Sequence, residues 1–188
     1  MPISVEQLVK ISGLNPARLR TYKWGEGIES TSRGVYLIST SKDILATEPI
    51  FESAPLNDTS ILYWIEKDEK LKTDGKPATL LNIKDRLDSY WLADETILYI
   101  GKSNSTIGIR QHMSNLYNLN LGNNQHINTG VWLKTLDILY QLHVHYISCA
   151  HPDDKKKEMI LNFKSQFSKK SKKKLMNHSH EFPFANNK

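Results

Sequence analysis

The chain has 188 residues, a net charge of +5 and an ordinary apolar content, which together are typical of one soluble domain with elaborations. No apolar run approaches the length of a membrane span, which excludes a protein built on membrane-crossing helices. The single cysteine, Cys149, excludes an intrachain disulfide framework and metal sites built from cysteine pairs. Because a lone cysteine favours a reducing compartment and the first residues lack a signal-peptide pattern, we expect a cytoplasmic protein without a membrane partner.

The first 30 residues predict an N-terminal helical appendage. Ser4 is followed three positions later by Gln7, a spacing typical of a capping box at the start of a helix. Pro16 can open a second helical turn that continues toward Trp24. Two short helices in this order resemble the start of a helix-turn-helix, but they are more often a cap over a core.

The remainder, residues 31–188, predicts one domain around three strands. Apolar and β-branched residues form these strands at 34–40, 96–103 and 142–150. Residues 41–95 predict an elaboration between the first two strands, with a turn at Asp74-Gly75 and a helix over 80–92. Within that elaboration, the stretch ILYWIEK is compatible with a further strand.

Two later helices are predicted, over 105–119 and 153–167, and a lysine-rich loop follows the second. The apolar stripe of the first consists of Ile109, Met113 and Leu116, with Tyr117 as a candidate fourth member. Residues 153–174 contain nine lysines against three acidic residues. A lysine cluster of this density favours a polyanion such as nucleic acid, although a solvated helix face would look the same.

Two tyrosines near glycines are the first candidates for chemistry. Tyr36 lies two residues after Gly34, and Tyr99 lies two residues before Gly101. If their strands are neighbours, the glycines leave room for a close approach, and two phenols can donate and accept hydrogen bonds to one water. The alternative interpretation is a pair of ordinary core strands that carry amphipathic tyrosines.

Other charged residues follow the second tyrosine. Lys102 and Arg110 suit a phosphate, because a guanidinium binds two phosphate oxygens at once, whereas Glu158 could hold a hard divalent cation. Each also has an ordinary interpretation, as a surface cation or a helix-terminal carboxylate. His143 and His145 share one face of a strand, so a histidine-bound zinc is a further, weaker alternative.

Taken in order, these residues resemble the GIY-YIG nuclease family. The shared features are two tripeptides, a helix arginine, a helix glutamate and a late asparagine, which here are Gly34-Val35-Tyr36, Tyr99-Ile100-Gly101, Arg110, Glu158 and Asn186. His126 is similar to a His-x-x-x-Gly pattern in a bacterial branch of the family. The resemblance implies an α+β fold, in which a small antiparallel sheet of three core strands is flanked by helices.

The resemblance also implies a metal-dependent DNA endonuclease. Tyr36 would act as general base or orient the attacking water, Tyr99 would position it, and Arg110 with Lys102 would stabilise charge on the phosphate. Glu158 would hold one Mg²⁺ (or Mn²⁺) ion, with Gly34, Gly101, His126 and Asn186 in support. The base role would require cations that lower the tyrosine pKa from about 10. A homodimer would suit double-strand cleavage, and the alternative function is a catalytically silent nucleic-acid-binding module.

Overall fold

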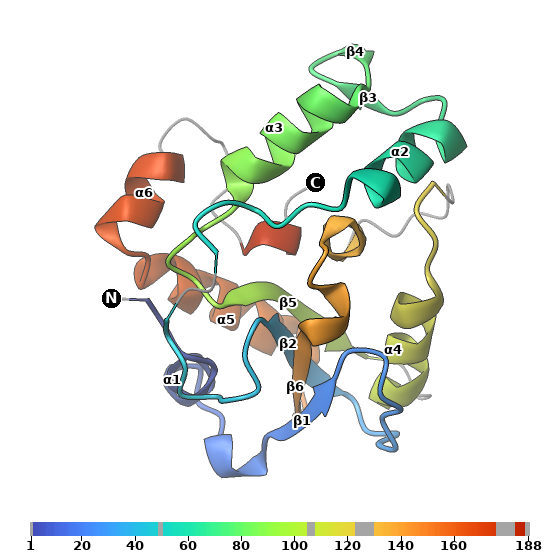
Figure 1. The fold of residues 1–188 in the computed structure, drawn as a ribbon. Coiled ribbons are helices and arrows are strands. Elements are labelled where there is room, and N and C mark those ends of the chain that lie inside the picture. Colours follow the sequence, from blue (N-terminus) through green and yellow to red (C-terminus); the bar gives the residue numbers. More distant parts are fainter. Residues whose placement is uncertain (1, 49–50, 105–107, 123–129, 176–182, 187–188) are drawn as a thin grey trace.

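A computed structural model describes residues 2–48, 51–104, 108–122, 130–175 and 183–186. In this part of the chain, helices lie against both faces of an antiparallel sheet, which confirms the α+β class (Figure 1). The strands of the sheet are β1 (Arg20–Lys23), β2 (Gly34–Ser39), β5 (Ile97–Ser103) and β6 (His143–Ser148). The helices are α1 (Val5–Ile11), α2 (Asp58–Lys67), α3 (Leu80–Tyr90), α4 (Gly108–Asn118), α5 (Pro152–Ser165) and α6 (Lys169–Leu175). Short 3₁₀ turns are η1 (Pro16–Arg18), η2 (Val131–Thr135), η3 (Leu139–Gln141) and η4 (Phe184–Asn186).

The sheet has four strands in the order β1-β6-β2-β5, so the prediction of three core strands was incomplete. The missing strand is β1, which pairs with β6 from Arg20 opposite Tyr146 to Lys23 opposite His143. Pro16 opens only one 3₁₀ turn, and Thr21 and the following tyrosine then suit the extended backbone that the edge of β6 can pair. The N-terminal segment is therefore partly strand rather than wholly helical.

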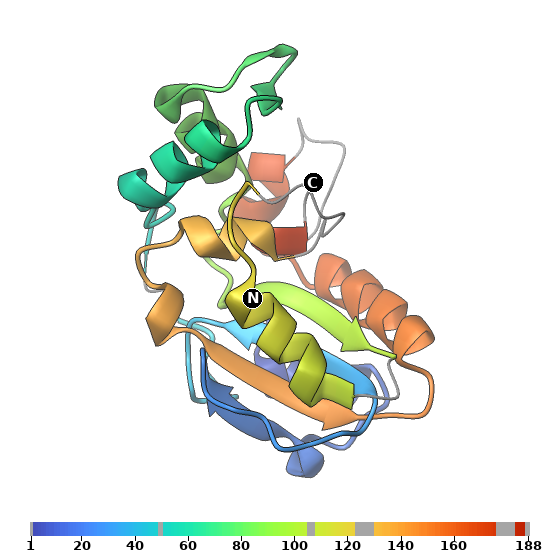
Figure 2. The ribbon, with the colours of Figure 1, turned by 90° about the vertical axis from the view of Figure 1, so that its right-hand side faces the viewer.

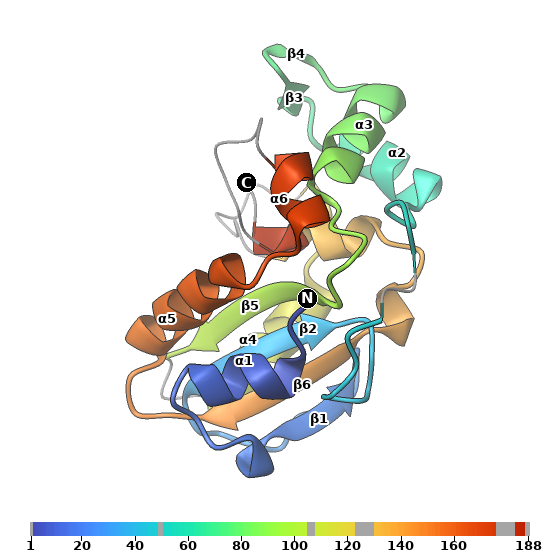
Figure 3. The ribbon, with the colours of Figure 1, turned by 90° about the vertical axis from the view of Figure 1, so that its left-hand side faces the viewer.

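Each face of the sheet has its own core, because alternate residues of a strand point to opposite faces. Val35 and Leu37 pack with α1 and α5 on one face (Figure 3). Tyr36 and Ile38 pack on the opposite face, which α4 covers (Figure 2). The predicted stripe of α4 is confirmed, since Ile109, Met113 and Leu116 are all buried. As predicted, Ser4 caps α1 by accepting a hydrogen bond from the Gln7 N–H.

The elaboration between the tripeptides extends the α4-side core and stands beyond the end of the sheet (Figure 1). It contains α2, α3 and a small hairpin of β3 (Lys72–Thr73) and β4 (Lys76–Pro77), whose turn is the predicted Asp74-Gly75. The prediction of a strand at ILYWIEK was wrong. Asn57 caps α2 by accepting from the Ser60 N–H, and only Ile61 of the helix is fully buried.

The lysine-rich stretch after α5 was predicted as a loop, but residues 169–175 form α6. Ser168 accepts a hydrogen bond from the Ser171 N–H, and Ser171 and Leu175 provide a buried face at helical spacing. Within the described ranges, every helix is too short or too polar to cross a membrane.

Candidate active site

Tyr36 and Tyr99 lie on the same face of neighbouring strands. Tyr36 is opposite Gly101 in the β2–β5 pairing, and Tyr99 is opposite Ile38, two positions along the same ladder. Their ring centroids are 5.8 Å apart, as diagonal partners on one sheet face allow. A Cβ atom at Gly101 would overlap the Tyr36 ring, so this glycine makes room for the first tyrosine itself. A Cβ at Gly34 would instead meet the β6 backbone.

A histidine completes the pair. The Tyr36 hydroxyl is hydrogen-bonded to Nε2 of His112 at 2.9 Å, with the two ring centroids 5.5 Å apart. Burial, and then the nearby Lys156 ammonium, lower the pKa of His112, which keeps the imidazole neutral near pH 7. A neutral imidazole can accept the phenolic proton at one ring nitrogen.

The environment of Tyr36 opposes the predicted phenolate base. The side chain is only 1% exposed, and burial followed by the neighbouring Tyr99 raises the pKa of Tyr36 well above 10. Cations were expected to lower this pKa, but desolvation dominates because it penalises the charged phenolate. Tyr36 is therefore a neutral phenol at physiological pH. It is hydrogen-bonded to His112, and a side-chain hydrogen bond with Tyr99 also raises its pKa.

Lys156 of α5 is a cation that lies beside Tyr99 and His112. Its ammonium group is 5.9 Å from the centroid of the Tyr99 ring, and it also acts on the pKa of His112. Tyr36, Tyr99, His112 and Lys156 together form what we term the tyrosine–histidine cluster. Its chemistry combines two phenols, one neutral imidazole and one ammonium.

Arg110 is not part of this cluster in the structure. It is exposed and lines a groove with Glu29 and Ser114, between α4 and the segment that follows β1. Residues two apart on a helix point about 200° from each other, so His112 facing Tyr36 turns Arg110 away. The start of α4 is also tethered, since the Arg110 N–H donates to the Ser30 carbonyl at 3.1 Å.

Glu158 is likewise on the far side of its helix from the cluster. Its carboxylate accepts a hydrogen bond from Lys155 at 2.6 Å, and Lys155 also donates to the Ser12 carbonyl at the end of α1. Lys156, which faces Tyr99, lies two residues away and therefore about 200° around α5. The described residues also contain no group of three or more His, Cys, Asp or Glu side chains that could hold a metal ion. A metal at Glu158 therefore does not fit the side-chain arrangement around the tyrosines.

The remaining predicted residues have structural contacts. Lys102 forms an ion pair with Asp153, which Asn104 also contacts, so these three residues meet beyond the end of β5. Asn186 accepts from the Ile100 N–H at 2.8 Å and donates to the Ile100 carbonyl at 2.9 Å, which closes the outer edge of β5. His126 lies outside the described residues.

The zinc alternative is not supported at His145. Its Nδ1 lies 2.9 Å from the Thr21 hydroxyl and its Nε2 lies 2.8 Å from the Ser39 hydroxyl, so both ring nitrogens are engaged. Burial lowers the pKa of His145 to about 4, which is typical of a neutral core histidine.

Sequence reasoning missed His112 and Lys156, although the sequence holds a signal for the first. His112 is three residues after Ile109 and four before Leu116, so the predicted apolar stripe of α4 already places it on the inner flank. Arg110 lies on the other flank. Lys156 has no such signal, because its neighbours Lys155 and Lys157 are chemically identical.

Comparison of the chain with models of known protein families, with curated proteins and with solved structures finds no match. A functional assignment for this chain therefore depends on the geometry of its own residues.

Proposed function

We propose that the chain hydrolyses phosphodiester bonds of DNA, with the tyrosine–histidine cluster as its active site. The observation that carries the proposal is the 2.9 Å hydrogen bond between the Tyr36 hydroxyl and Nε2 of His112, beside Tyr99 on the same sheet face. A hydroxyl paired with a neutral imidazole is an arrangement that moves protons in general-base catalysis. The order of the two tripeptides and the positive charge of residues 153–174 support a nucleic-acid substrate.

The proposed mechanism uses groups of the cluster in distinct roles. A water attacks phosphorus and passes a proton to the Tyr36 oxygen, while the phenolic proton moves to Nε2 of His112. The bond from phosphorus to the 3′ oxygen of one deoxyribose breaks, and that oxygen takes a proton from solvent. The resulting His112 imidazolium is next to the phosphate, where its charge and that of Lys156 oppose the negative charge of the transition state. The His112 imidazolium later returns its proton to solvent, which restores the starting state. Tyr99 orients the water or a phosphate oxygen by hydrogen bonding. Lys102 and Arg110, outside the cluster, contact phosphates and thereby position the strand.

The requirement for one Mg²⁺ or Mn²⁺ ion stays a prediction from the resemblance. Because the Glu158 carboxylate is paired with Lys155 and turned away from Tyr36, no step of the mechanism depends on it. The homodimer also stays a prediction, and it matters only if both strands are cut.

The test is nicking of a supercoiled plasmid with and without divalent cation. Tyr36→Phe and His112→Ala should each lower the nicking rate by about 10²- to 10⁴-fold, as expected for loss of a general base. Tyr140→Phe and His151→Ala are matched controls, because both residues are exposed and should leave the rate unchanged. Undiminished nicking by a folded His112→Ala protein would overturn the proposed site.

Arg110→Ala and Glu158→Ala distinguish the active site inferred from the geometry from the one implied by the family resemblance. The geometry predicts smaller losses for these two variants than for Tyr36→Phe, because both side chains lie across their helices from the cluster. The resemblance alone predicts losses that are equally large. Comparing the nicking rates of these three variants and the wild-type chain on one plasmid preparation distinguishes these expectations.

A second candidate function is a nucleic-acid-binding module without catalysis. The burial of Tyr36, which is 1% exposed, favours it, because a reacting phosphate must reach the phenol. This candidate predicts salt-sensitive DNA binding but no nicking in either Mg²⁺ or Mn²⁺.

A further inference from the structure

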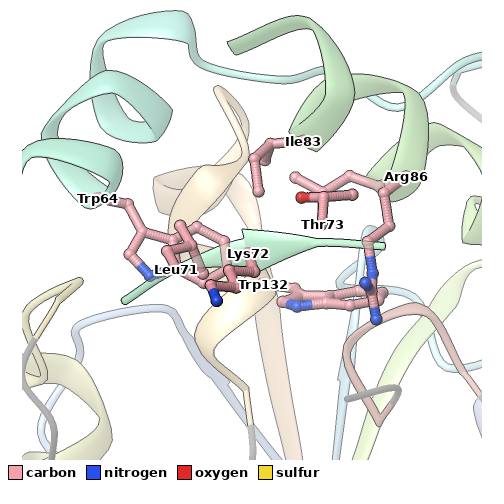
Figure 4. Close-up of a pocket in the computed structure, with 8 residues that line it drawn as sticks. Trp64, Leu71, Lys72, Thr73, Ile83, Arg86 and Trp132 are labelled. Atoms are coloured by element: carbon pink, nitrogen blue, oxygen red, sulfur yellow. The ribbon is translucent and has the colours of Figure 1, made fainter. Parts of the chain in front are cut away.

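A small aromatic cavity lies between the elaboration and η2, apart from the tyrosine–histidine cluster. Its walls come from α2, the β3–β4 hairpin, α3 and η2 (Figure 4). We term it the tryptophan pocket. Its polar and aromatic lining residues are Trp64, Lys72, Thr73, Arg86 and Trp132, and the aliphatic side chains of Leu71, Ile83 and Leu87 complete the lining. In Figure 4, Trp64 and Trp132 stand on two sides of the pocket, and Arg86 extends from α3 toward the Trp132 indole.

The size of the cavity limits its occupant. Its volume is about 170 Å³. An apolar protein cavity of about 150 Å³ accepts a benzene molecule, whereas pockets for drug-sized ligands begin near 300 Å³. The tryptophan pocket can therefore receive one flat ring system, but it cannot enclose a whole nucleotide or a larger cofactor.

One wall of the pocket is held in place by other rings. The Trp132 indole packs against Tyr90 at 5.4 Å and against Phe184 at 5.6 Å between ring centroids. Phe184 in turn packs edge-on against Trp91 at 5.3 Å. A wall braced in this way loses little conformational freedom when a ring stacks on it, which favours binding.

The charged residues of the pocket select the kind of ring. Lys72 and Arg86 are both among its lining residues, and no carboxylate is among the described ones. Two cations disfavour a methylated ammonium group, the usual guest of an aromatic cage. They favour a ring joined to an anion, which would remain at the mouth beside the exposed Lys72.

One residue of the pocket also carries a polar group that has no partner. The Thr73 hydroxyl is buried, and within the described part of the chain it has no hydrogen-bond partner. A buried polar group in this state is costly. Rotation of the Thr73 side chain would turn the hydroxyl to the pocket, and a ligand that carries ring nitrogens or carbonyls could then satisfy it. An apolar peptide side chain could not.

From these features we propose that the tryptophan pocket binds a single unpaired nucleobase, stacked on the indoles, with its phosphate against Lys72. The proposal rests on the proposed function in one respect, since it takes the base to belong to the DNA strand held at the tyrosine–histidine cluster. The protein would then prefer DNA that offers an extrahelical base over fully paired duplex.

The pocket and the cluster share a structural connection. Trp132 and Tyr36 belong to one continuous core on the same face of the sheet. Phe184, which braces Trp132, is in the same 3₁₀ turn as Asn186, and Asn186 holds Ile100 between Tyr99 and Gly101. A base stacked on Trp132 would thus lie against the same packed rings that hold the turn supporting the second tripeptide.

The experiment is a binding measurement that does not require cleavage. A Tyr36→Phe protein is titrated with three hairpin duplexes that are identical except at one position, which is paired, bulged with adenine, or bulged with an abasic residue. Stacking of one base on an aromatic side chain is worth about 1–3 kcal/mol. We therefore expect the adenine-bulged hairpin to bind about 5- to 150-fold more tightly than the paired and the abasic hairpins. Free dAMP at millimolar concentration tests whether an isolated nucleotide also enters.

Matched variants assign the effect to the pocket. Trp64→Ala should remove the preference for the adenine bulge, whereas Tyr63→Ala should keep it, because Tyr63 is an exposed aromatic on the same helix that does not line the pocket. Trp64→Phe should retain part of the preference, because it keeps an aromatic ring at this position. This variant therefore tests the pocket even if the Trp64→Ala protein fails to fold. Equal binding of all three hairpins by the Tyr36→Phe protein, or a preference that survives Trp64→Ala, would overturn the proposal.

The outcome also separates this inference from the proposed function. A bulge preference without nicking by the wild-type chain would retain the pocket and refute the nuclease. Nicking without a bulge preference would retain the nuclease and refute the pocket. Binding of an apolar peptide in place of DNA would also refute the pocket assignment.

Discussion

The proton state of the Tyr36–His112 pair sets how activity should depend on pH. The pKa of His112 is lowered, chiefly by burial, from its usual value of about 6.5, so the base form is present above that pH. Nicking should therefore be constant between about pH 7 and 8.5 and should decline only below about pH 6.5. Initial rates at constant ionic strength, with DNA binding measured in parallel, would check this. A rate that climbs steadily toward pH 10 would indicate a Tyr36 phenolate instead.

Gly101 offers a second test at the level of one residue. A methyl group there would overlap the ring and hydroxyl of Tyr36, so Gly101→Ala should displace the phenol from His112. We expect nicking to fall at least tenfold and the free energy of unfolding to drop by about 1–3 kcal/mol, as in other overpacked cores. Gly27→Ala is the control, because among the described residues other than Gly27 and its two chain neighbours no atom lies within 4 Å of the place its methyl group would take. A Gly101→Ala protein with normal nicking would show that the observed Tyr36 position is not needed.

Among the elements, α4 and α5 decide which side chains meet at the site. Each helix presents to the tyrosines a residue two positions from the one that the resemblance selects, His112 for Arg110 and Lys156 for Glu158. The buried stripe sets this rotation, since Ile109 and Met113 on α4 and Met159 and Phe163 on α5 must face the core.

The η4 turn is the element that protects the outer edge of β5, and Asn186 carries this role. Its two hydrogen bonds to Ile100 satisfy backbone groups that would otherwise lie unpaired at a sheet edge. Asn186→Ala should lower the free energy of unfolding by about 2 kcal/mol. Urea unfolding measures this loss, with the exposed Asn118→Ala as a control that should change stability by less than about 0.5 kcal/mol. Equal midpoints for the two variants would contradict the edge role.

For the molecule as a whole, two buried groups give opposite dependences of stability on pH. Burial lowers the pKa of His145 to about 4 in the folded chain. As pH falls from about 6.5 to 4, this imidazole is protonated in the unfolded chain but not in the folded one, so the free energy of unfolding decreases. Burial raises the pKa of Glu95 to about 7 in the folded chain. As pH rises from about 4.5 to 7, this carboxyl is ionised in the unfolded chain but not in the folded one, so the free energy of unfolding again decreases. Each effect is on the order of 3 kcal/mol, and between about pH 4.5 and 6.5 they nearly cancel.

Glu95→Gln should remove the pH dependence of stability that comes from Glu95. We expect the variant to be more stable than the parent at pH 7.5. It should also lose stability more steeply as pH falls toward 5, because the destabilisation from His145 is then no longer offset by Glu95. Urea unfolding at pH 5, 6 and 7.5 would show it. A variant whose stability follows the same shallow curve as the parent would contradict the assignment to Glu95.

Local patterns along the chain were sufficient for several elements of this fold. The strands at β2, β5 and β6, the stripe of α4, the cap at Ser4 and the Asp74-Gly75 turn all depend on residues close together in the chain. Short-range hydrogen bonds and apolar periodicity decide such features, so sequence reasoning reaches them. The strand at Arg20–Lys23 was missed because its partner, β6, is more than a hundred residues away.

The chemistry of the site was decided by tertiary packing. Whether Tyr36 ionises depends on its burial beneath α4, and whether His112 or Arg110 meets it depends on how α4 rotates to bury its stripe. The tryptophan pocket likewise brings Trp64 of the elaboration beside Trp132, which lies beyond α4 in the chain. Desolvation and long-range contact exist only in the folded chain, so a motif can nominate the tyrosines but cannot identify the groups that surround them.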